Sequence, residues 1–270
     1  MTRISRWAFS FVVLSLCAAV SGCAATQQVT NRLNPERQRE YDTKSTLAQV
    51  YEKEGKLREA VELYRELHAS YKDDVLVSHR LGVSLMQLGS EDEGLILLEE
   101  AHLLAPEDAE ILNDLGYAYI LTGDLETAEE LIQRSYHLQP EDERTVANLA
   151  LVAGYAGRDQ ECLSLFKQVV TEAEAHANLA FICSQRGDGS QAMEHYSRAL
   201  DHDPDLRAAA VGLTQLHEMK QEFDREQAAI AARQAAPETQ VRPAASSETS
   251  GTENSPSRVE LTGGDFNWAE

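Results

Sequence analysis

Five segments of this chain align with one another without gaps, and this internal repetition limits the folds that the chain can adopt. Each segment begins at a leucine followed by a small residue, and these leucines are Leu47, Leu81, Leu115, Leu149 and Leu179. A glycine stands eight residues after each leucine, and a second small residue stands thirteen after it. The spacing between leucines is 34, 34, 34 and then 30 residues. A period of this length predicts stacked supersecondary units that share a continuous core.

Each repeat has the sequence pattern of two helices joined by a glycine turn. The small residue beside the leucine lets a second helix approach closely, and the glycine can end the first helix in a left-handed conformation without steric cost. Pro106, Pro140 and Pro204 close the second, third and fifth repeats, because proline stops one helix and can open the next. The fourth repeat lacks this proline and four residues, so we expect a shortened second helix there.

This pattern resembles the tetratricopeptide repeat over residues 41 to about 206. The resemblance implies an all-α solenoid of about five helix-turn-helix repeats. We expect the repeats at 41–74, 75–108, 109–142, 143–172 and 173–206. Residues 207–234 continue the helical pattern without a glycine turn, so we expect them to form a C-terminal capping helix.

The first 22 residues have the layout of a secretory signal peptide. Arg3 and Arg6 precede an uncharged run of about 14 residues, which is shorter than the roughly 20 that a membrane-spanning helix needs. The sequence Val-Ser-Gly-Cys at 20–23 resembles the lipobox of bacterial lipoproteins. That resemblance implies cleavage after Gly22 and a lipid on Cys23, with residues 23–40 as a tether. An uncleaved interfacial anchor and an ordinary cleaved signal are the alternatives.

The expected lipid would make a membrane one partner of this protein. Ala24 follows the cysteine. In Gram-negative lipoproteins of this kind, the absence of aspartate at that position implies export to the outer membrane. The repeats would then face the periplasm.

The charge balance limits the other partners. The chain has 24 basic and 45 acidic residues, with a net charge of −21, which disfavours nucleic acid as a partner. Residues 235–270 are rich in Pro, Ser, Thr and Glu, so we expect a disordered acidic tail. Phe266 and Trp268 near its end are either an unremarkable terminus or a docking motif.

No sequence motif indicates catalysis, a cofactor or a metal. The eight histidines are scattered, and the chain lacks a phosphate-binding glycine loop and a nucleophile elbow. We therefore expect a protein that is not an enzyme. Cys162 and Cys183 are either two buried free thiols or a disulfide between the fourth and fifth repeats.

In tetratricopeptide-repeat proteins the first helices line a concave groove, and this likeness implies a binding site for other proteins. Residues two and five positions after the repeat leucine should point into it. The predicted groove residues are Val83, Met86, Tyr117, Ile120, Leu151 and Phe181, edged by His79, Asn113, Asn148 and Asn178. The alternative is that neighbouring helices cover some of them. Arg80 is the only basic residue at the groove positions of repeats two and three, so a clamp for carboxylate tails is absent. An amphipathic helix or an apolar extended segment suits this groove.

The segments NDLGYAYILTGDLETAEELI, VANLALVAGYAGR and ANLAFICSQRGD resemble the pilus-assembly lipoproteins of the tight-adherence (TadD-like) class. That resemblance implies a non-catalytic, membrane-anchored scaffold that assists assembly of a pilus or secretion complex. The alternative is an adaptor or regulator of cell-envelope enzymes.

Overall fold

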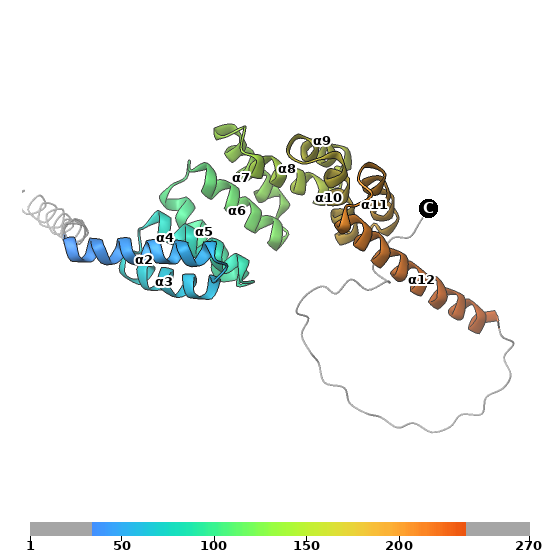
Figure 1. Ribbon diagram of the computed structural model, residues 1–270, viewed down its shortest axis with the longest axis horizontal. Helices are drawn as coiled ribbons and strands as arrows, with labels where there is room; N and C mark the ends of the chain where they lie inside the picture. Colours follow the sequence, from blue (N-terminus) through green and yellow to red (C-terminus); the bar gives the residue numbers. More distant parts are fainter. Residues whose placement is uncertain (1–33, 236–270) are drawn as a thin grey trace, which may run out of the picture. The chain divides into compact units, whose positions relative to one another are not determined.

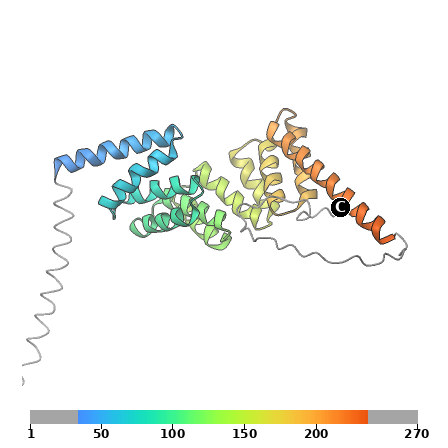
Figure 2. The same cartoon turned by 90° about the horizontal axis from the view of Figure 1, so that it is seen from below.

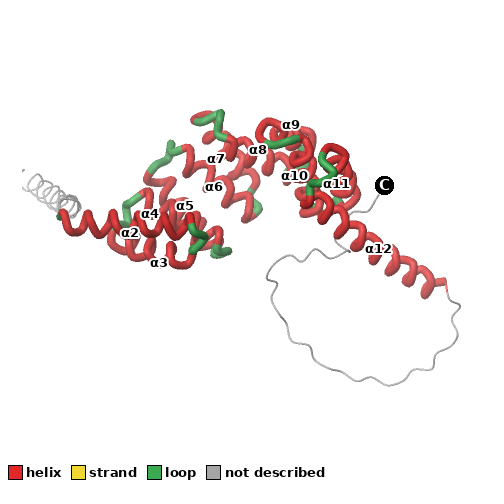
Figure 3. The backbone as a smooth tube through the Cα atoms, viewed as in Figure 1, coloured by secondary structure: helices red, strands yellow, loops and turns green. Residues whose placement is uncertain are grey.

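The computed structural model describes residues 34–235, and every regular element in this range is an α-helix (Figures 1 and 3). This confirms the predicted all-α repeat fold. The helices are α2 (Pro35–Lys53), α3 (Leu57–Ser70), α4 (Val75–Gln87), α5 (Glu91–Leu104), α6 (Ala109–Thr122), α7 (Leu125–Leu138), α8 (Glu143–Tyr155), α9 (Asp159–Val169), α10 (Glu172–Gln185), α11 (Gly189–His202) and α12 (Arg207–Ala235).

The repeat glycines separate the two helices of each repeat, as predicted. Their φ angles lie between 72° and 86°, in the left-handed region, and they are Gly55, Gly89, Gly123, Gly157 and Gly187. At the first three of these positions, no atom lies within 4 Å of the place that a Cβ would take. The turn therefore selects glycine for its backbone conformation and not for lack of space.

Side chains that accept hydrogen bonds fix the starts of the first helices. Asp74 and Asp142 each accept a bond of 3.1 Å from the backbone amide three residues later. The short fourth repeat is followed by a different signal, because Thr171 and Glu174 form a reciprocal capping box at the start of α10. The α9 helix has 11 residues, whereas the second helices of the other repeats have 14, so the predicted shortening is confirmed.

Helix α2 begins within the predicted tether at 23–40. Asn34 caps the helix by accepting a 3.0 Å bond from the Glu36 amide, and Pro35 takes the first helical position. Residues 35–40 are therefore helical, because an asparagine cap followed by proline is a strong start signal. Cys23 and the remainder of the tether lie outside the described residues, as do the signal sequence and tail residues 236–270.

The chain divides into two compact units, and the division falls between Ala118 and Tyr119, within α6. In the first unit, α2 and α3 pack against α4 around buried Tyr64 and Leu81. The α4 and α5 helices approach so closely that a Cβ on Gly82 would lie 2.9 Å from the Leu98 side chain. Among the described residues, none covers one side of α2, where Leu47 and Val50 are 39% and 41% exposed.

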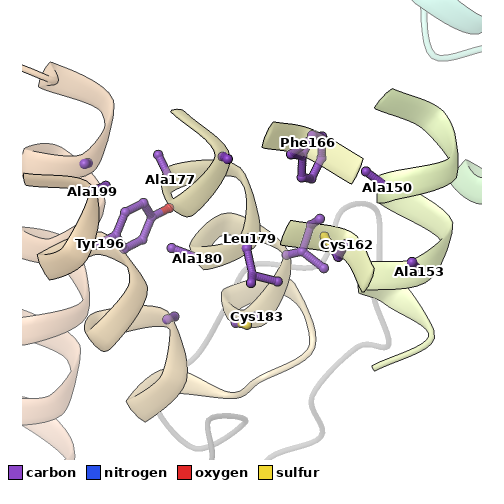
Figure 4. Packing of buried hydrophobic residues seen from close by; sticks show 14 of the residues in the cluster. Ala150, Ala153, Cys162, Phe166, Ala177, Leu179, Ala180, Cys183, Tyr196 and Ala199 are labelled. Carbon is purple, nitrogen blue, oxygen red and sulfur yellow. The ribbon is translucent and has the colours of Figure 1, made fainter. Parts of the chain in front are cut away.

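In the second unit, small residues on α8 and α10 pack against larger side chains from α9 and α11. Figure 4 shows Phe166, Leu179 and Tyr196 in this core. The α12 helix covers the α10–α11 pair, and its Gly212 lies so near Tyr196 that a Cβ there would meet the ring at 2.4 Å. From Asp224 to Gln234 every residue of the helix is exposed, and this part extends away from the helices that α12 covers (Figure 2).

Candidate functional site

Two of the five residues that stand two positions after the repeat leucines are exposed. We call this set the first-helix row, and it comprises Gln49, Val83, Tyr117, Leu151 and Phe181. Tyr117 is 41% exposed and Phe181 is 50% exposed, while Val83 and Leu151 are partly buried. In the second unit, Leu151 and Phe181 occupy equivalent positions on α8 and α10, which contact each other.

The predictions for Met86 and Ile120 are wrong, because both side chains face the second helix of their own repeat. A Cβ on Gly94 would lie 2.8 Å from the Met86 sulfur, so this side chain covers α5. Ile120 is only 7% exposed and packs with Ala128 and Ile132 of α7. A residue five positions after the repeat leucine is four positions after the small residue that contacts the second helix. Four residues complete slightly more than one helical turn, so the two side chains point only about 40° apart.

Asn113 does not edge the groove, because its side chain is only 2% exposed. Its position, two residues before the repeat leucine, is also buried at Ser45, His79 and Ala177. In the first unit, this face connects first helices: Nε2 of His79 on α4 lies 2.8 Å from a carboxylate oxygen of Asp114 on α6. Asn148 and Asn178 are partly exposed, so they remain candidates.

Arg80, the basic residue at the groove positions of repeats two and three, forms an ion pair within the protein. Its guanidinium donates a 2.7 Å hydrogen bond to Glu52 on α2, and the two side chains form an ion pair. Glu52 also accepts hydrogen bonds from Ser84 and from Tyr64, at 2.9 and 3.0 Å. Burial, together with the charge of Glu52, raises the pKa of Tyr64 above its usual value.

A cluster of three histidines and one glutamate lies between α10 and α11 in the second unit. We call it the histidine cluster, and it consists of Glu172, His176, His195 and His202. Nδ1 of His176 lies 3.0 Å from Nδ1 of His195. The ring of His176 also stacks on that of His202, with centroids 5.8 Å apart and planes 7° from parallel. Nε2 of His202 lies 3.9 Å from Oε1 of Glu172.

The electrostatics of this cluster keep its buried histidine neutral. His176 is 4% exposed, and burial, reinforced by His195 and Lys167, lowers its pKa to about 4. Burial also lowers the pKa of His195. The hydrogen bond from Lys167, which forms an ion pair with Glu172, lowers the pKa of that carboxyl.

Sequence reasoning missed this cluster, although the spacing contains a signal. Glu172 and His176 are four residues apart on α10, and His195 and His202 are seven apart on α11, so each pair shares one helical face. Only the packing of the two helices brings the pairs together. A second group of possible ligands, His79, Glu110 and Asp114, lies in the first unit, but it contains a single histidine that already contacts Asp114.

Cys162 and Cys183 are buried free thiols. Burial raises the pKa of Cys162 to about 12 and that of Cys183 to about 11, so both are protonated and unreactive near neutral pH. Nearby, Arg186 donates to the Gly154 carbonyl and to Asp159, both at 2.6 Å, and to Asp188 at 2.9 Å. This arginine joins the turn of the fourth repeat to that of the fifth.

Two family models for the tetratricopeptide repeat match the chain, one over residues 45–74 and one over residues 96–143. These two segments therefore match the tetratricopeptide repeat. No curated protein sequence matches it.

Solved structures similar to this repeat protein include MamA and YrrB. A structure described as MamA MSR-1 has 24% sequence identity and a TM-score of 0.49, and the match covers 62% of this chain and 97% of that one. YrrB, described as a TPR protein with an unusual peptide-binding site, has 19% identity and a TM-score of 0.48. That match covers 62% of this chain and 88% of YrrB.

Within residues 34–235, the repeat protein has no helix with the length and apolar character needed to cross a membrane.

Proposed function

We propose that this tetratricopeptide-repeat protein is a non-catalytic scaffold that binds other proteins through its first helices. The observation that carries the proposal is the exposure of Tyr117 and Phe181, at 41% and 50%, at equivalent positions of two repeats. Large aromatic side chains are favoured centres of protein interfaces, because they bury much area with few rotatable bonds.

The expected affinity is modest. Burying each such side chain contributes roughly 1.5 to 3 kcal/mol, and the loss of freedom on association removes much of that sum. A dissociation constant on the order of micromolar follows.

The chemistry of the face favours an apolar partner segment. In the second unit, Leu151 and Phe181 provide the apolar surface, and Asn148 and Asn178 offer amide groups beside them. Arg80 is bound to Glu52, so it is not available to hold a free carboxylate. An amphipathic helix or an extended apolar segment fits this surface, and basic residues beside that segment would suit a chain with a net charge of −21.

The proposed place of action is the periplasmic face of a bacterial membrane, most specifically the outer membrane. The lipobox pattern ending at Cys23 supports a lipid anchor, and the absence of aspartate after it supports outer-membrane export. The resemblance to tight-adherence lipoproteins supports a role in assembling a pilus or secretion complex.

The test is affinity capture from bacterial envelopes with the double variant Tyr117→Ala/Phe181→Ala. Recovery of partner proteins should fall about tenfold or more, which corresponds to about 1.4 kcal/mol. The matched control is Leu103→Ala/Leu138→Ala, which removes two exposed apolar side chains from second helices. Both variants should keep the circular dichroism of the parent, because their side chains are not in the core.

Equal recovery by the folded double variant and the parent would rule out the first-helix row as the binding site. The identity of the captured proteins separates the two pathways. Secretin or pilus components support the assembly role, whereas cell-wall enzymes support the adaptor role.

A further inference from the structure

The histidine cluster has the composition of a transition-metal site and no role in the scaffold function proposed above. One ligand atom from each of Glu172, His176 and His202 can be chosen so that all three lie within 4.8 Å of one another. Imidazole nitrogens with a carboxylate oxygen are the donors that zinc and its neighbours prefer, whereas calcium and magnesium prefer oxygen alone.

We propose that Glu172, His176 and His202 bind one divalent transition-metal ion of the Zn²⁺ type. The site would provide three protein ligands from two helices, with a fourth position left for water. It would link α10 to α11 across the fifth repeat. This inference does not depend on the partner-binding role of the first helices.

The contact at Nδ1 of His176 determines which nitrogen of this histidine can bind the metal ion. Nδ1 of His176 is engaged with Nδ1 of His195, so Nε2 is the nitrogen that can bind the ion. Metal-bound histidines generally use their second ring nitrogen in a hydrogen bond of this kind, which fixes the ring orientation.

The side chains of Glu172 and His202 can move closer together around a metal ion. Zinc lies about 2.0–2.1 Å from nitrogen or oxygen ligands, so tetrahedral ligand atoms are about 3.4 Å apart. The present separations are somewhat longer, but Glu172 and His202 are exposed side chains that can move by this amount. His176 is buried and would act as the fixed point.

Lys167 is the competitor for this site. Its ammonium group forms an ion pair with Glu172, and its positive charge would repel a metal ion. Removing the charge of Lys167 should therefore strengthen metal binding, which adventitious surface binding elsewhere on the protein would not show.

The experiment titrates Zn²⁺ into the metal-free full chain by isothermal titration calorimetry, in a large excess of Mg²⁺ that saturates sites made only of carboxylates. We expect one Zn²⁺ per chain. His202→Ala and Glu172→Gln should each weaken binding about tenfold or more, and Lys167→Met should strengthen it several-fold. The matched control is His217→Ala, which removes an exposed histidine whose Nδ1 bonds only to its own helix, at Leu213.

A second measurement uses Co²⁺, whose visible absorption is intense in four-coordinate sites and weak in octahedral ones. The parent chain and His217→Ala should show the intense spectrum, and His202→Ala should not. The proposal is overturned if the parent binds no Zn²⁺ at micromolar concentrations. It is equally overturned if His202→Ala and Glu172→Gln, with unchanged circular dichroism, bind Zn²⁺ as tightly as the parent.

Discussion

At the scale of single residues, Arg186 connects groups near the ends of three helices. It bonds the Gly154 carbonyl at the end of α8, Asp159 at the start of α9, and Asp188 before α11. The hydrogen bonds to Asp159 raise the pKa of Arg186 above its usual value. A bond to a charged partner contributes more than one between neutral groups, and its loss leaves the partners unpaired.

Replacing this arginine by methionine should therefore lower the free energy of unfolding by about 2 kcal/mol. Chemical denaturation of Arg186→Met against the parent measures the change. The control is Arg198→Met, which removes a single exposed pair with Glu194 one turn away and should cost about 0.5 kcal/mol or less. Equal, small effects of both substitutions would contradict a connecting role for Arg186.

At the scale of helices, the repeat pattern in the sequence was enough to predict the fold. It was not enough to predict every groove residue, because side chains that point in slightly different directions from one helix can have different neighbours. Glycine turns, closing prolines and the missing four residues act locally, so their effects on α9 and the repeat turns follow from the sequence. Met86 and Ile120 were misassigned because their direction differs only slightly from that of the residues facing the second helix. The histidine cluster depends on contact between two helices, which the spacing along one helix does not reveal.

The junction after the short α9 helix is an element whose stability can be measured. With three fewer residues than its counterparts, α9 provides less contact area to its neighbours. Amide hydrogens of residues 167–178 should therefore exchange faster than those at the equivalent junction of the third repeat, residues 133–144. Hydrogen exchange read by mass spectrometry compares the two segments in one sample. Equal protection would show that the capping box of Thr171 and Glu174 fully compensates for the missing turn.

At the scale of the whole molecule, charge determines how the protein can meet a membrane. A chain with a net charge of −21 is repelled by anionic headgroups. Residues 34–235 contain no helix that could cross a bilayer. The proposed lipid anchor at Cys23 would need two or more acyl chains for stable attachment.

The variant Cys23→Ser should remain an unlipidated precursor and leave the membrane fraction. In the proposed lipoprotein, attachment of every acyl chain depends on the sulfur of Cys23. Fractionation of cells, followed by mass spectrometry of the N-terminus, tests both points. The control is Cys17→Ser, which alters the other cysteine of the signal region and should be processed normally. A processed variant that still sediments with membranes would contradict lipid anchoring at Cys23.

The exposed side of α2 in the first repeat could accept a further repeat. Val50 is exposed, whereas its counterparts Ser84, Ala118, Val152 and Ile182 are buried by a neighbouring repeat. The first helix therefore already carries a surface of the kind that receives a further helix pair. We expect that tandem duplication of one 34-residue unit at this end would give a folded chain that is one repeat longer.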